Sequence, residues 1–102
     1  MQTVFTTQSV NTPSVQTGAT ALAANPNRLG FTIQNQSGAN PLLVRLGSGA
    51  TGSAYHVVLK AGSTAADGNG GIYSQTDGTI YGGAITVAGA SPSYTVLEMG
   101  GI

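Results

Sequence analysis

Glycine and proline interrupt this sequence so often that they exclude long helices. The 102 residues include 16 glycines and 4 prolines, and the longest stretch free of both is the segment from Met1 to Thr12. Helices of globular proteins usually run about 8–20 residues and tolerate neither residue well in their interiors. The short segments between the glycines are rich in β-branched and aromatic residues, a pattern typical of strands. The sequence therefore predicts an all-β fold.

Several segments alternate between apolar and polar residues as half-buried strands do. In the clearest one, Leu29, Phe31 and Ile33 share one face. We expect this segment to form a hairpin with residues 42–46 through a longer loop. With one or two strands before residue 25, the set predicts a single jelly-roll-like β-sandwich of about seven or eight short antiparallel strands. The expected strands cover residues 29–34, 42–46, 55–60, 72–75, 79–88 and 93–99.

Two asparagines mark the ends of the clearest strand. The turn from Asn25 to Arg28 precedes it and sets its register, and Asn35 follows it. Asparagine side chains commonly bond to the backbone of a turn, so we expect Asn35 to cap the loop that comes next.

Residues 1–24 differ in composition from the rest of the chain. They are mostly threonine, glutamine, serine and alanine, and their larger apolar residues are Val4, Phe5, Val10, Val15 and Leu22. We expect this segment to be an N-terminal arm that docks on a neighbouring chain, or else one or two edge strands. Residues 25–102 are expected to be the β-sandwich domain.

Charge is almost absent from the chain. Its formal net charge is zero, and the charged residues are Arg28, Arg45, Lys60, Asp67, Asp77 and Glu98. Soluble monomeric domains usually have surfaces of which about a quarter to a third of the residues are charged. Neutral surfaces tend to associate, because nothing repels them from one another. We therefore expect this chain to lie against other protein.

The same scarcity of charge limits the partners. Three cations cannot neutralise a nucleic-acid backbone, and no apolar run approaches the roughly 20 residues of a membrane-spanning helix. The segment Met1 to Thr7 lacks the basic and apolar regions of a signal peptide. We expect synthesis in the cytoplasm, no nucleic-acid partner and no membrane partner.

Residues that carry out catalysis are scarce as well. The chain has no cysteine, and His56 is its one histidine, so no pair of histidines can hold a metal within one chain. We interpret His56 as a surface or interface residue, the alternative being a metal bound by three copies on a trimer axis. Glu98 is expected to pair with Arg28 or Arg45. The sequence predicts no enzyme, no catalytic residue and no small-molecule substrate.

The segment from Asp67 to Gly70 begins like a calcium-binding loop, but it does not continue like one. Glycine stands at the fifth position and, as Gly78, at the twelfth, where a bidentate glutamate is required. We predict a turn capped by Asp67 instead. The glycines at 68, 70 and 71 also lack the lysine of a phosphate-binding loop. No metal ligand, cofactor-binding residue or cofactor is predicted.

Several motifs together resemble a known group of proteins. They are Asn27-Arg28-Leu29-Gly30-Phe31-Thr32-Ile33-Gln34-Asn35, Leu42-Leu43-Val44-Arg45-Leu46-Gly47, Tyr55-His56-Val57-Val58-Leu59-Lys60, Ile85-Thr86-Val87-Ala88-Gly89 and Tyr94-Thr95-Val96-Leu97-Glu98. The series resembles small virion proteins of tailed bacteriophages that are encoded among head genes. The resemblance covers roughly residues 27–98 and leaves the segment before it unmatched.

The resemblance implies a structural role in the virion, on the surface of the phage head. We expect a capsid decoration (cement) protein that binds the major capsid protein and forms a homotrimer. One alternative is a head-fibre base, tail or adhesin component. An alternative of another class is a small glycan-binding module, for which Tyr55, Tyr73, Tyr81 and Tyr94 would have to gather on one exposed face.

Overall fold

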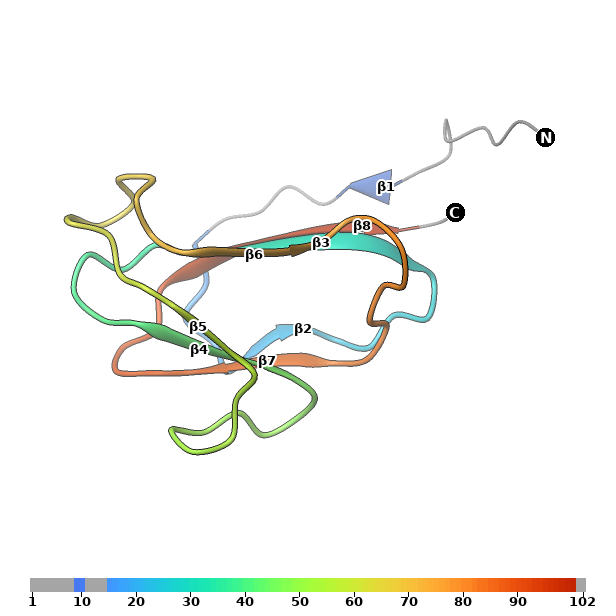
Figure 1. Ribbon diagram of the computed structural model, residues 1–102, viewed down its shortest axis with the longest axis horizontal. Coiled ribbons are helices and arrows are strands. Elements are labelled where there is room, and N and C mark those ends of the chain that lie inside the picture. The colour runs from blue at the N-terminus through green and yellow to red at the C-terminus, as the bar shows by residue number, and fades with distance from the viewer. Residues whose placement is uncertain (1–8, 11–14, 101–102) are drawn as a thin grey trace.

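Two antiparallel sheets of four strands face each other in the computed structural model, which describes residues 9–10 and 15–100 (Figure 1). No helix occurs among these residues. The predicted all-β sandwich is therefore confirmed. Its strands are β1 (Ser9–Val10), β2 (Thr20–Leu22), β3 (Arg28–Asn35), β4 (Leu42–Leu46), β5 (Val57–Leu59), β6 (Ile72–Gln75), β7 (Ile85–Ala88) and β8 (Tyr94–Gly100).

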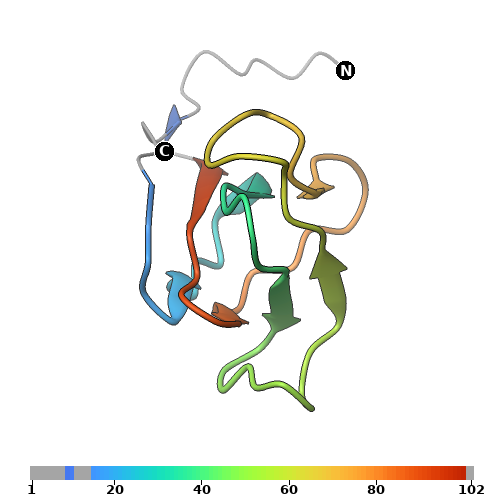
Figure 2. The ribbon, with the colours of Figure 1, turned by 90° about the vertical axis from the view of Figure 1, so that its left-hand side faces the viewer.

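The strands pair from the ends of the chain inward, the first with the last and the second with the seventh. β1 pairs with β8, β2 with β7, β3 with β6 and β4 with β5. Successive pairs belong to alternate sheets, so the first sheet has the order β1-β8-β3-β6 and the second the order β2-β7-β4-β5. As a result, β1 and β2 form the edges on one side of the sandwich, and β5 and β6 form the edges on the other (Figure 2).

The hydrophobic core lies between the two sheets. Phe31 and Ile33 of β3 and Val44 of β4 are completely buried, because alternate residues of each strand point toward the opposite sheet. Tyr94 closes the core at the start of β8, and its hydroxyl donates a hydrogen bond to the Gly18 carbonyl at 2.6 Å. The buried apolar residues are Leu22, Phe31, Ile33, Leu42, Val44, Leu59, Ile85, Val87, Tyr94 and Val96.

The predicted hairpin between residues 29–34 and 42–46 is wrong. β3 lies in the first sheet and β4 in the second, so residues 36–41 cross from one sheet to the other. The Ser37 hydroxyl accepts hydrogen bonds from the backbone N–H groups of Ala39 and Asn40 and turns the chain there. Both edges of β3 are occupied by β8 and β6, which leaves no place for β4.

Three details of the predicted strands also differ. The register of β3 against β8 shifts between Arg28 and Gly30, and such a bulge reverses the alternation of inward and outward residues. Leu29 is therefore 40 % exposed, whereas Arg28 points inward. The strand predicted over 79–88 begins only at Ile85, after the Gly82-Gly83 stretch. The strand predicted over 55–60 begins at Val57, which leaves Tyr55 outside it.

The described part of the segment 1–24 lies along the edges of the sandwich. β1 is the edge of the first sheet and β2 the edge of the second, and Leu22 belongs to the core. Between them, Gln16 exchanges two backbone hydrogen bonds with Tyr94. The described residues of this segment therefore form edge strands, which was the alternative to a docking arm. The rest of the predicted arm, residues 1–8 and 11–14, lies outside the described residues.

Candidate functional site

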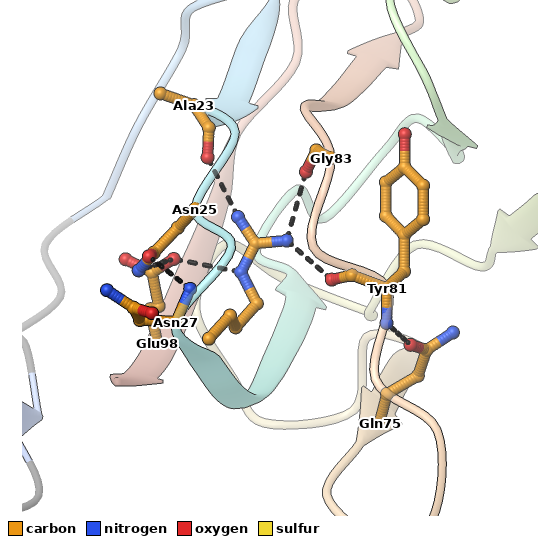
Figure 3. Close-up of polar contacts among 8 residues, drawn as sticks. Ala23, Asn25, Asn27, Gln75, Tyr81, Gly83 and Glu98 are labelled. Atoms are coloured by element: carbon orange, nitrogen blue, oxygen red, sulfur yellow. Dashed lines mark hydrogen bonds and ion pairs between the residues drawn. The ribbon is translucent and has the colours of Figure 1, made fainter. Parts of the chain in front are cut away.

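The best-built polar cluster surrounds the buried guanidinium of Arg28 (Figure 3). Its Nε donates to the Glu98 carboxylate at 2.9 Å, and one terminal nitrogen donates to the carbonyls of Tyr81 at 2.7 Å and Gly83 at 3.0 Å. The other terminal nitrogen donates to the Ala23 carbonyl at 2.8 Å. The pairing of Glu98 with Arg28 confirms one of the two predicted partners. Because these contacts occupy every nitrogen of the guanidinium, the cluster is structural.

The ion pair also turns two charges away from the outer face of the first sheet. The Arg28 side chain is fully buried, and the Glu98 side chain is 24 % exposed. Both residues point inward from the first sheet. Among the described strands, the only other charged residue is Arg45 of β4, while Lys60, Asp67 and Asp77 lie in loops. The outer faces of the two sheets are thus nearly free of charge.

A second buried polar group, the Asn35 amide, ties the crossing loop to the second sheet. Its nitrogen donates to the carbonyls of Asn40 at 2.9 Å, Leu59 at 3.0 Å and Lys60 at 3.1 Å. Its oxygen accepts a hydrogen bond from the Ser37 N–H at 2.9 Å. The predicted cap at Asn35 is confirmed, and it spans both sheets.

The loop after β5 is organised around the carboxylate of Asp67. This carboxylate accepts hydrogen bonds from the backbone N–H groups of Thr64 at 2.9 Å, Asn69 at 2.9 Å and Ser63 at 2.8 Å. The N–H of Thr64, followed by that of Asn69, lowers the pKa of Asp67 from 3.8 to about 2. These contacts confirm a turn capped by Asp67.

A titration tests this turn. The pKa of Asp67 is lower in the folded protein than in the unfolded chain, so the carboxylate stabilises the loop at pH values above the unfolded pKa. This contribution to stability is lost as the pH falls from about 4 through about 2. We expect an NMR titration midpoint near 2 and faster amide exchange over residues 63–69 in Asp67→Ala. Asp77→Ala is the matched control, since Asp77 also precedes a glycine in an exposed loop. An ordinary midpoint for Asp67, or equal exchange in both variants, contradicts the prediction.

The four tyrosines do not gather on one exposed face. Tyr94 is completely buried, and burial raises the pKa of its hydroxyl. Tyr73 and Tyr81 are partly buried and pack against the core, and Tyr55 is 44 % exposed. A sugar-stacking platform made of all four is therefore not formed.

His56 lies on the exposed surface beside β4. Its Nδ1 accepts a hydrogen bond from the Leu46 N–H at 3.0 Å. Among residues 9–10 and 15–100, no three acidic or histidine side chains lie close enough to hold a metal ion, and no pocket is found. The described chain contains no helix that is long and apolar enough to cross a membrane.

The outer face of the first sheet is an uncharged surface of polar and apolar side chains. In one row across β8, β3 and β6, Leu97 is opposite Thr32 and Thr32 is opposite Ser74. The Ser74 hydroxyl donates to the Thr32 hydroxyl at 2.8 Å. A second row runs through Thr95, Gln34 and Ile72. We call these six residues the outer face of the first sheet.

The outer face of the second sheet is partly apolar. Leu43 of β4 is opposite Val58 on one side and Ala88 on the other, and Val58 is 52 % exposed. Arg45 lies two residues further along β4, opposite Thr86. The sequence alone does not mark these residues as one surface, because only the strand pairing brings them together.

Comparison of the chain with models of protein families, with curated proteins and with solved structures found no match.

Proposed function

We propose that this chain is a structural protein of a tailed-bacteriophage virion, a decoration protein that binds across major capsid subunits on the head and acts as a homotrimer. The observation that carries the proposal is the outer face of the first sheet, where the strands present no charge. A face of this kind can lie against other protein without leaving an unpaired charge buried. The resemblance over residues 27–98 supports the same role.

The order of the strands is a second support. The pairing of the first strand with the last and the second with the seventh agrees with the jelly roll that we propose, an architecture that occurs in viral capsid and lectin domains. Fold alone does not give function, so this pairing adds to the proposal without carrying it.

The proposed role is thermodynamic and involves no chemical step. A protein that binds the assembled shell but not loose subunits stabilises the shell by RT ln(1 + [L]/Kd). Burial and hydrogen bonds would supply the binding energy, because the strand faces have few charges to contribute. We therefore expect binding that depends little on salt.

Co-sedimentation with intact capsids tests the function. Between about 0.05 and 0.5 M salt, where exposed charges become screened, we expect the Kd to change by less than about threefold. Thr32→Asp places a charge in the centre of the outer face and should weaken binding at least about tenfold. Thr51→Asp, the same change in an exposed loop of the other sheet, is the control and should bind as the unmodified chain does. Binding only at low salt, or none at all, contradicts the proposal.

A further inference from the structure

One edge of the first sheet is left open in the single chain. β6 pairs with β3 on one side, and within residues 9–10 and 15–100 no backbone hydrogen bond joins its other side to a further strand. A row of unpaired N–H and C=O groups is a template on which another strand can pair.

β6 also lacks the features that usually protect an open edge. Natural edges are blunted by short strands, prolines or charged side chains. The other three edge strands have such features. β1 and β2 are only two and three residues long, and β5 is followed at once by the exposed, charged Lys60. β6 has four residues, Ile72-Tyr73-Ser74-Gln75, with neither charge nor proline. Its Ile72 is 58 % exposed, the highest value among the large hydrophobic residues between positions 15 and 100.

A segment of the same chain whose composition favours strands precedes β1, the opposite edge of this sheet. Residues 2–8, Gln-Thr-Val-Phe-Thr-Thr-Gln, contain no charge, glycine or proline and are rich in the residue types that favour strands. They precede β1, which is three positions away from β6 in the order β1-β8-β3-β6. Within one chain, therefore, β8 and β3 lie between β1 and the open edge of β6.

We propose that residues 2–8 of one copy pair as an added strand with β6 of a second copy. β1, which the donor segment precedes, and the acceptor strand β6 are opposite edges of the first sheet. A head-to-tail contact between them, repeated around a three-fold axis, would give the closed ring of the proposed homotrimer. β6 is about 13 Å long, whereas seven extended residues span about 23 Å. The segment can therefore cover β6 and still cross between neighbouring copies. The inference rests on the proposed homo-oligomer but does not depend on capsid binding.

Spin labelling tests the contact, because the chain has no cysteine of its own. A spin label on Thr6→Cys is mixed with isotope-labelled protein that carries no spin label. We expect broadening of the amide signals of residues 72–75, with those of residues 57–59 on the neighbouring edge much less affected. A label on Thr51→Cys is the control. Equal broadening of both edges, or none, overturns the proposal.

Light scattering on variants gives an independent test. Deleting residues 2–8 should convert the oligomer into a folded monomer. Ile72→Lys should do the same by charging the edge, whereas Val58→Lys, at a position of similar exposure on β5, should leave the oligomer intact. Circular dichroism checks that each variant is folded. A monomeric unmodified chain, or an oligomer that survives the deletion, overturns the inference. An oligomer that dissociates as expected but never binds capsids contradicts the proposed function alone.

Discussion

Replacing Arg28 by alanine is expected to lower the free energy of unfolding by roughly 3–5 kcal/mol. The substitution leaves the Glu98 carboxylate without its cation and the carbonyls of Ala23, Tyr81 and Gly83 without a donor. Small domains have a total stability of about 5–15 kcal/mol, so the variant loses a large share of it. Urea unfolding followed by circular dichroism measures the loss.

Two further variants separate charge from geometry at this site. Arg28→Lys keeps the charge but cannot reach four acceptors with one ammonium group, and we expect it to recover less than about half of the lost stability. Arg45→Ala is the matched control. Arg45 is half-buried and makes one long hydrogen bond, at 3.4 Å to the Gly49 carbonyl, so its loss should cost less than about 1 kcal/mol. Similar losses for Arg28→Ala and Arg45→Ala would show that the cluster is not what holds the strands together.

The substitution Asn35→Asp is expected to be nearly as damaging at neutral pH, by roughly 3–4 kcal/mol. The side chain keeps its size, but a carboxylate replaces the nitrogen that donates to the Asn40, Leu59 and Lys60 carbonyls. Asn35 is only 1 % exposed, so the new negative charge is buried against three oxygens. These surroundings favour the protonated acid and raise its folded-state pKa.

The pH dependence of this variant follows from that direction. A raised folded-state pKa means that the folded protein holds a proton that the unfolded chain releases. The stability deficit of Asn35→Asp therefore grows as the pH rises above about 4, and it is smallest in acid. Urea midpoints at several pH values measure the trend. Asn27→Asp, the same change in an exposed turn, should cost less than about 0.5 kcal/mol at every pH. A deficit that does not vary with pH contradicts the prediction.

The local features of the fold could be predicted because they depend on neighbouring residues. Alternation in β4 and β6 gave the bounds of both strands, and short-range hydrogen bonding gave the roles of Asn35 and Asp67. The partners of β3 could not be read in this way. Its ladder with β8 joins residues that lie 59 to 72 positions apart, and no local pattern distinguishes that pairing from a hairpin with residues 42–46.

The same limit applies to the candidate surface and to the Arg28 cluster. An arginine is expected to be exposed, and only the register shift beside Gly30 turns Arg28 inward to Glu98. Once that pair is buried, the outer face loses its charges. The sequence could predict a nearly neutral protein, but which face is neutral depends on one irregularity in one ladder.

The pairing of early strands with late ones has a consequence for the order of events during synthesis. β1 and β2 find their partners only in β8 and β7, so the second sheet cannot be completed before Ala88 has been made, nor the first before β8 (Tyr94–Gly100). β4 and β5 can pair early, but β3 must wait for β6 and then for β8. Long-range pairing of this kind folds slowly. The chain on the ribosome therefore carries open strand edges, and a product that stops before β8 lacks one of the two inner strands of its first sheet.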